Sequence, residues 1–528
     1  MGIPSYFSWI VRNHTNIIKK FCPKTIHVNN LYLDCNSIIY DAIRLIDFTK
    51  LTDNDVNTIL TAVCVKIDEY IHLLKPDNNI FIAFDGVAPV AKLDQQRERR
   101  YKSLYQNKIT RSICQTTDPD PWNTTAITPG TLFMKKLTET INLKYNNTNS
   151  EKYNAKNIII SCSDECGEGE HKLFQYIRDN SLEHSSATTI IYGLDADLIM
   201  LSINHLPISK NIYLFRETPH FIQSICADLE PNESYLMDIP ELANIITNDM
   251  NNGVNSKHDR IYDYIFLCFF LGNDFMPHFP AINIRSGGIE KMLNAYKATI
   301  GGTSDILTDG KTIYWKNVKR MVQFLADNEE TFLKTEAKNR DRREKNLMPD
   351  ITNEEKLKKF DSIPMYERSL EKYINPYKAN WQIRYYKTLF NTDINDEKRK
   401  QISTNYLEGL EWTMKYYTSG CPDWRWSYQY NYPPLLYDLV KYIPTTNYEF
   451  VKQKLPNPVT DLVQLCYVLP KQSLHFLPPN LYKELLEKHD DWYKTDCTFV
   501  WAYCRYFWES HVVLPHIDIK ELEEFVAS

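Results

Sequence analysis

The stretch Ile190-Ile-Tyr-Gly-Leu-Asp195-Ala-Asp197-Leu-Ile-Met-Leu201 joins a short apolar run to two aspartates. The run ends at Gly193 and is typical of a buried strand in a parallel sheet. In an extended segment, residues i and i+2 point to the same side, so both carboxylates should face the carboxyl edge of the sheet. Open α/β folds bind their ligands at that edge. A divalent cation there would offset the cost of burying two like charges.

A lone pair of aspartates could equally be one helix cap and one solvated acid, so the metal interpretation depends on the rest of the chain. Three further apolar runs have the length of strands, namely residues 31–33, 80–84 and 158–160. Helical periodicity over residues 56–74 separates the first two. This alternation favours an α/β fold with a mostly parallel central sheet. Asp34 and Asp85 directly follow two of the runs, so they should join the aspartate pair at one edge.

Three more acids extend this candidate site. Glu168 and Glu170 are flanked by glycines, which allow close approach of the backbone, although an acidic first helical turn is the alternative. Asp274 follows the apolar run at 264–271. The candidate metal ligands are Asp34, Asp85, Glu168, Glu170, Asp195, Asp197 and Asp274. Oxygen ligands favour Mg²⁺ or Mn²⁺ over zinc, and so many carboxylates suit two ions about 4 Å apart, as in phosphodiester hydrolysis.

A basic helix is predicted directly after Asp85. Residues 92–111 contain seven Lys or Arg and two acids, in a chain with a net charge of −6. Helical spacing places four polar side chains on one face: Lys92, Gln96, Arg99 and Arg100. Arginine forks and an amide beside a metal site are typical of a phosphate pocket. The alternative is a solvated basic face.

The composition is that of a soluble globular protein of two or three domains, with 43% hydrophobic and 24% charged residues. The sequence has no apolar stretch long enough to cross a membrane and no signal-peptide layout, so we expect a cytoplasmic protein with no membrane partner. The 12 cysteines are scattered without a CxxC pair, which predicts reduced thiols and no zinc site. Since the net charge is negative, any polyanion must bind at local basic patches.

A change in composition suggests the domain boundary. Residues 334–361 hold 16 charged residues in 28 with almost no apolar periodicity. We interpret this segment as a flexible charged linker between a first region, 1–333, and a mainly helical second region, 362–528. Residues 406–437 contain ten Tyr or Trp in 32. Most of these should be core, while one or two exposed rings would suffice to stack on bases.

Taken together, these segments resemble the XRN family of 5′→3′ exoribonucleases. The matching motifs, in the order of the family, are Met1-Gly-Ile-Pro4, 31–40, 83–101, 127–137, 167–172, 190–201 and 270–278. A weaker resemblance continues through 409–412, 420–426, 468–470 and 514–518. The chain ends just after the last of these, so we expect a minimal catalytic unit.

The resemblance implies a core like that of PIN domains and flap nucleases, and a monomeric enzyme with two Mg²⁺ ions (or Mn²⁺). It would hydrolyse single-stranded RNA with a 5′-monophosphate, processively and to nucleoside 5′-monophosphates, in RNA decay after decapping. By position, the seven acids would bind metal, and Lys92, Gln96, Arg99 and Arg100 would bind the 5′-phosphate. Tyr40 stands where the family has a base-stacking histidine; it can stack but cannot take up a proton near neutral pH.

The partner of Tyr40 in base stacking would be Trp426 or, less well matched, Trp424. Two other functions are alternatives. A flap-endonuclease-like, structure-specific DNA nuclease would carry Gly-x-Gly-x-Lys after the last acid, but Pro277-His-Phe-Pro280 stands there. A catalytically inactive RNA-binding module would lack at least one metal acid, and none of the seven is missing. The resemblance therefore favours the exoribonuclease.

Overall fold

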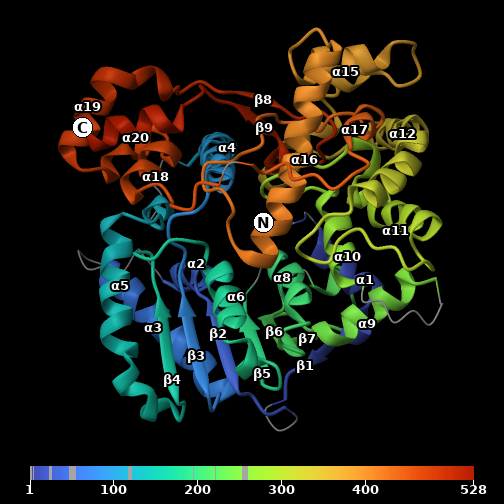
Figure 1. Ribbon diagram of the computed structural model, residues 1–528. Helices are drawn as coiled ribbons and strands as arrows, with labels where there is room; N and C mark the ends of the chain where they lie inside the picture. Colours follow the sequence, from blue (N-terminus) through green and yellow to red (C-terminus); the bar gives the residue numbers. More distant parts are fainter. Residues whose placement is uncertain are drawn as a thin grey trace.

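The alternation of strands and helices in the first half of the chain produces one seven-stranded sheet in the computed structural model (Figure 1). Its order is β1-β7-β6-β5-β2-β3-β4. The strands are β1 Ile18–Lys20, β2 Asn30–Asp34, β3 Asn79–Ala83, β4 Asn157–Ser161, β5 Thr188–Tyr192, β6 Asn211–Glu217 and β7 Ser234–Asp238. Strands β2 to β6 pair in parallel, whereas β7 is antiparallel to β6 and β1. The predicted mostly parallel sheet is confirmed; β1, β6 and β7 were not predicted.

The structure describes residues 3, 5–22, 26–46, 55–116, 122–193, 195–219, 222–252, 260–452 and 454–528. Met1, Gly2 and Pro4 of the opening motif lie outside the described residues, as does Leu194. No helix in the described part of the chain is both long and apolar enough to cross a membrane. All 12 cysteines lie in the described part of the chain, and six of them are buried; their reduced state stays a prediction.

Alternate residues of the central strands belong to two hydrophobic cores, one on each face of the sheet. Leu31 and Leu33 of β2 join the core under one set of helices, and Tyr32 joins the core on the other face. The first face is covered by α2 Asn36–Leu45, α3 Asp55–Leu74 and α5 Leu132–Tyr145. The other face is covered by α6 Gly169–Asp179, α8 Asp197–His205 and α9 Ile239–Met250. Both faces of β2 are therefore buried, which explains its continuous apolar sequence.

Most of the other helices lie above the sheet in Figure 1, and those after residue 361 confirm the mainly helical second region. The whole group consists of α10 Ile261–Phe269, α11 Gly288–Thr299, α12 Trp315–Glu344, α13 Asn353–Asp361, α14 Ser369–Ile374, α15 Trp381–Leu389, α16 Asp396–Ser419, α17 Leu436–Tyr442, α18 Asp461–Val468, α19 Pro479–His489 and α20 Ile519–Ala527. Outside this group are α1 Tyr6–Asn13, α4 Val90–Cys114 and α7 Ser181–His184, and a hairpin of β8 Thr498–Val500 and β9 His511–Val513.

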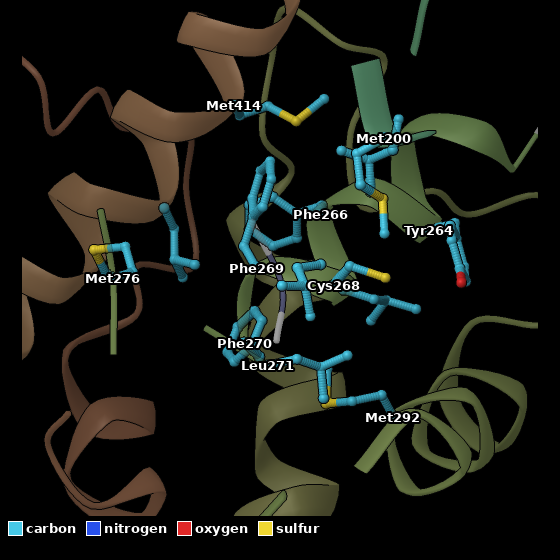
Figure 2. Close-up of a cluster of buried hydrophobic side chains, with 14 of the residues drawn as sticks. Met200, Tyr264, Phe266, Cys268, Phe269, Phe270, Leu271, Met276, Met292 and Met414 are labelled. Carbon is cyan, nitrogen blue, oxygen red and sulfur yellow. The ribbon is translucent and has the colours of Figure 1, made fainter. Parts of the chain in front are cut away.

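One hydrophobic core connects the sheet to these helices. Figure 2 shows Phe266 and Phe269 of α10 close to Met200 of α8 and to Met414 of α16. The same cluster extends from Ile3 to residues beyond 500. The core is therefore continuous across the charged segment that we interpreted as a domain boundary.

That charged segment, 334–361, is not a flexible linker, and this prediction was wrong. Helix α12 continues to Glu344, and α13 begins at a capping box made by Thr352 and Glu355. Arg340 is only 2% exposed, and its guanidinium lies 2.8 Å from Glu371 Oε1 and donates to the carbonyl oxygen of Cys504. The prediction from composition failed because charged side chains can be buried when they are paired.

Replacing Glu371 by alanine should lower the free energy of unfolding by about 3–5 kcal/mol, because Arg340 and Arg368 would stay buried without their shared carboxylate. The control Glu354→Ala removes only an exposed pair with Lys358 and should leave stability nearly unchanged. Urea denaturation measures both. Equal stability of the two variants would mean that Arg340 is not buried against the second region.

Candidate metal centre and phosphate pocket

The carboxyl ends of three neighbouring strands bring the first acids together. Strand β2 lies between β3 and β5, with Asp34 level with Ala83, and Leu33 level with Tyr192. Asp34 ends β2, Asp85 follows β3, and Asp195 follows β5. All three line one cavity of about 1250 Å³, together with Glu168 and Glu170. A parallel sheet thus collects carboxylates that are far apart in sequence.

Gly169 allows helix α6 to begin directly against two of these carboxylates. Its backbone N–H donates to Asp85 Oδ1 at 2.7 Å. A Cβ at this position would lie 2.8 Å from Asp34 Oδ1, so any larger residue would displace that side chain. Asn36 holds the other oxygen of Asp85 at 2.5 Å through its Nδ2. Asp85 is therefore held by two hydrogen bonds before any ligand binds, and Asp34 packs tightly against the start of α6.

Glu168 and Glu170 lie at the start of α6, which agrees with the alternative of an acidic first turn. Both side chains are buried, however. Glu168 Oε1 accepts a hydrogen bond from the Tyr416 hydroxyl at 2.9 Å. Its Oε2 lies 2.6 Å from Lys92 Nζ. Acids in a first helical turn interact favourably with the helix dipole at the surface, without being buried. The burial of Glu168 and Glu170 is therefore not explained by that alternative.

Asp195 and Asp197 do not lie in an extended segment, and the reason given for their common direction was wrong. The chain turns directly into α8, whose first residue is Asp197. The N–H of Asp197 donates to Asp195 Oδ1 at 3.3 Å. Asp195 lines the cavity, whereas Asp197 lies behind it and accepts a hydrogen bond from the Tyr417 hydroxyl at 3.0 Å. The pair contributes one carboxylate to the wall and one to the layer beneath.

Asp274 joins the cluster through a lysine. It lies in the turn after α10, and its Oδ2 is 2.5 Å from Lys92 Nζ. Since Lys92 also contacts Glu168, one buried ammonium bridges two of the candidate metal ligands. Asp274 does not line the large cavity. Lys92 is therefore a counter-ion of the acid cluster as well as part of the cavity wall.

The buried carboxylates of the cluster carry more negative charge than Lys92 can neutralise. Burial, followed by Asp195 and Asp274, raises the pKa of Asp197 to about 8. Burial and neighbouring carboxylates also raise the pKa of Asp34 and of Glu170 well above the ordinary range. For Asp274, burial raises the pKa, but several favourable interactions, the largest of them with Lys92, lower it on balance. Divalent cations would relieve this repulsion.

The donor set fits a hard divalent cation. Glu168, Glu170 and His171 each place one ligand atom within 4.8 Å of the others, and the remaining candidates are carboxylates. Carboxylate oxygens are the preferred donors of Mg²⁺ and Mn²⁺. His171 was not selected from the sequence; burial lowers its pKa well below the ordinary value, so its ring is neutral. It stacks on Tyr416 with ring centroids 3.8 Å apart.

The basic face of α4 forms the next part of the cavity wall, and the predicted residues Lys92, Gln96, Arg99 and Arg100 all line it. Arg100 Nη2 donates to Thr128 Oγ1 at 2.6 Å. Its Nη1 is buried without a hydrogen-bond partner in the described part of the chain. Burial, then the neighbouring Arg99, lowers the pKa of Arg100 to about 10. A buried guanidinium donor without an acceptor is costly, and an anion would satisfy it.

The structure places only one of the predicted stacking residues in this cavity. Tyr40 of α2 lines it and is 37% exposed. Trp426 does not line it but stacks on Trp412, with centroids 5.1 Å apart. Trp424 does not line it either. Trp122, which the sequence analysis did not select, is the tryptophan in the cavity wall.

Tyr416 and Tyr417 are the other residues that sequence reasoning missed. Their hydroxyls donate to Glu168 and Asp197 from helix α16, more than 200 positions further along the chain. The only signal for them was the aromatic-rich stretch at 406–437, which does not reveal the faces of its side chains. Through this pair, the helical region helps to hold the carboxylates that the sheet supplies.

A parallel sheet with acids at its carboxyl edge and a basic helix beside them defines a nuclease core of the α/β class. Two family models match the chain: "XRN 5′-3′ exonuclease N-terminus" over residues 1–218, and "Xrn1 helical domain" over residues 255–372 and 365–528. The chain therefore belongs to the XRN family of 5′–3′ exonucleases.

Named relatives agree with this assignment. The 5′-3′ exoribonuclease 2 of Arabidopsis thaliana is 26% identical, and the match covers 100% of this chain and 67% of the relative. The corresponding protein of Gallus gallus is 26% identical, with 99% and 69% covered. The 5′-3′ exoribonuclease 1 of Saccharomyces cerevisiae is 28% identical, with 99% of this chain but 43% of the relative covered. The chain thus spans about two thirds of the first two relatives and less than half of the third.

Proposed function

We propose that this chain is a processive 5′→3′ exoribonuclease that hydrolyses single-stranded RNA with a 5′-monophosphate to nucleoside 5′-monophosphates. The observation that carries the proposal is one cavity in which Asp34, Asp85 and Asp195 face the basic side of α4. The names of the relatives support the polarity and the RNA substrate. Its place would be RNA decay after decapping, where such 5′ ends arise.

The proposed cofactor is a pair of Mg²⁺ ions, or Mn²⁺, held by the seven carboxylates. When bound, such ions lower the pKa of the attacking water and stabilise the leaving 3′-oxygen. Asp34, Asp85, Glu168, Glu170 and Asp195 reach the cavity, while Asp197 and Asp274 would act from the layer beneath. Lys92 already pairs with two of these acids, so it limits the excess negative charge until the cations bind.

The protein's own residues would set where cleavage occurs. Arg99 and Arg100 supply guanidinium donors for a 5′-phosphate, and Gln96 supplies an amide. Because this face adjoins the carboxylates, an RNA held by its 5′-phosphate presents its first phosphodiester bond to them. Tyr40 would stack on a base at the same wall. Trp426 does not line this cavity, whereas Trp122 does, so Trp122 is the better placed second aromatic residue.

The proposal is tested by incubating the purified protein with RNAs that differ only at the 5′ end: monophosphate, triphosphate or hydroxyl. With Mg²⁺ we expect nucleoside monophosphates from the monophosphorylated RNA and little product from the other two. EDTA should abolish the reaction. Equal attack on all three ends, or activity that survives EDTA, would refute the proposal.

The Tyr417→Phe variant tests the link between α16 and the metal centre. It removes only the hydroxyl that donates to Asp197. Loss of such an outer hydrogen bond should raise the Mg²⁺ concentration for half-maximal activity by about tenfold. The control Tyr385→Phe removes a buried hydroxyl that donates to the Pro433 carbonyl, away from the acids. A Mg²⁺ titration that gives the same midpoint for both variants would contradict this role for Tyr417.

A further inference from the structure

A second cavity, of about 350 Å³, lies against the other side of α4, and Asp274 of the acid cluster forms part of its wall. Neighbouring residues of the helix face different cavities: Gln95 lines the second, whereas Gln96 lines the first. The other walls come from Ser5 and from segments 271–278, 283–285, 427–431 and 508–511. These segments come from distant parts of the chain, so the cavity forms only in the folded protein.

The ion pair of Lys92 and Asp274 lies between the two cavities. Lys92 lines the first cavity and Asp274 lines the second, and their side chains are 2.5 Å apart. A small molecule released at the carboxylates would therefore be one side-chain layer away from the second cavity.

The charged side chains of this second cavity are already paired within the protein. Glu509 lies 2.5 Å from Arg285, and Lys102 donates to the Ser510 carbonyl. Asp94 accepts a hydrogen bond from Tyr467. Burial lowers the pKa of the lining residue His278 to about 4, so its ring is neutral at pH 7. These charged groups therefore already have partners within the protein, which favours a ligand that is itself uncharged.

What the cavity does offer is a pair of neutral polar atoms and several aromatic faces. Gln95 Oε1, an acceptor, and Asn273 Nδ2, a donor, are buried without a hydrogen-bond partner in the described residues. Both side chains line the cavity, and so do Tyr430 and Trp508. Unpaired buried amide atoms are costly, and a ligand with a matching donor and acceptor would satisfy them.

This chemistry describes a neutral, planar heterocycle with a polar edge. Aromatic walls favour a flat ring, and a volume of about 350 Å³ is at the lower end of ordinary ligand pockets. We propose that the second cavity binds a nucleobase, with Gln95 and Asn273 contacting its polar edge and the aromatic side chains its faces. The base could come from the mononucleotide released at the metal centre, a source that rests on the proposed function, or from free nucleotide in solution.

The direct test is binding of adenosine to the protein in EDTA, without RNA, measured by calorimetry. Adenosine has no phosphate and so cannot use the basic face of α4. We expect saturable binding that Gln95→Leu weakens by about tenfold, the cost of one lost hydrogen bond. The matched variant Gln96→Leu, one residue along the same helix, should bind adenosine as the wild type does. Tyr430→Leu, which changes a different wall of the cavity, should also weaken binding, so the assignment does not depend on the Gln95 variant alone.

Absence of adenosine binding at millimolar concentration, or equal binding by the Gln95 and Gln96 variants, would overturn the proposal. These results do not depend on whether the protein cleaves RNA, so they are separate from the test of the proposed function. Activity provides the converse comparison: Gln95→Leu should leave hydrolysis of 5′-monophosphate RNA unchanged in its first turnover, whereas Gln96→Leu should weaken substrate binding.

The two sources of the base are distinguished by adding adenosine during RNA hydrolysis. If the cavity receives the product, saturating adenosine should slow the later turnovers without slowing the first, and Gln95→Leu should be insensitive to it. If the cavity binds only nucleotide from solution, adenosine should bind without changing any turnover. Inhibition of the first turnover in wild type and Gln95→Leu alike would place adenosine in the metal-centre cavity and contradict the assignment.

Discussion

Hydrolysis of 5′-monophosphate RNA should fall by about three orders of magnitude in the Asp195→Asn variant. Asp195 lines the cavity beyond the carboxyl end of β5, two residues before the first residue of α8. Asparagine keeps the shape of the side chain but removes its charge. Metal ions supply several kcal/mol of transition-state stabilisation, and each factor of ten corresponds to about 1.4 kcal/mol. Single-turnover rates at saturating Mg²⁺ measure the loss.

The matched control is Asp164→Asn. Asp164 is an exposed acid in the loop just before Glu168 and does not line the cavity. It changes the net charge by the same amount and should retain full activity. If the Asp195 variant were as active as this control, the cluster would not be the catalytic centre, and the proposed function would lose its main support.

The Arg100→Met variant should lose most of the preference for a 5′-monophosphate over a 5′-hydroxyl end, by a factor of about 10–100. Arg100 has one guanidinium nitrogen fixed by Thr128 and one buried without a partner in the described residues. A hydrogen bond to a charged group contributes about 1.5–3 kcal/mol, which corresponds to that range. The ratio of kcat/KM for the two RNAs measures the preference.

Lys108→Met is the control for Arg100. It removes a positive charge from an exposed position of the same helix, outside the cavity wall. Its effect should be equal on both RNAs and should weaken at higher salt, since exposed charges act at long range. A uniform loss on both RNAs for Arg100→Met as well would show that Arg100 contributes general attraction and does not recognise the 5′ end.

The arrangement of the acids at the sheet edge could be predicted because it depends on local pattern and one general rule. Apolar runs of strand length identified β2, β3, β4 and β5, and parallel strands place their carboxyl ends together. The face of α4 was predictable for the same reason, because helical spacing alone puts Gln96 and Arg100 on one side. Strands β1, β6 and β7 were not predicted. Of these, β1 lies at the edge of the sheet and β7 next to it, and β1 and β6 carry more charged residues than the predicted strands.

Other parts of the site depend on contacts that no local pattern contains. The direction of the two aspartates was argued from an extended segment, but the chain enters α8 at Asp197, so only Asp195 faces the cavity. Likewise, a charged composition suggested a linker where Arg340 is buried against Glu371. In both cases the environment of the side chain, and not its residue type, decides its role.

The sequence by itself determined the class of fold, the set of carboxylates and the basic helix beside them, because the periods of strands and helices are properties of neighbouring residues. Only the tertiary structure decided that Lys92 bridges Glu168 and Asp274, that Tyr416 and Tyr417 reach back to the acids, and that Trp426 packs on Trp412. Apart from the stacked pair Trp412 and Trp426, these contacts join residues that are far apart in the sequence, by up to 248 positions for Tyr416 and Glu168. They arise when separate hydrophobic surfaces pack into one core, and the geometry of that packing is not encoded in any single stretch of the chain.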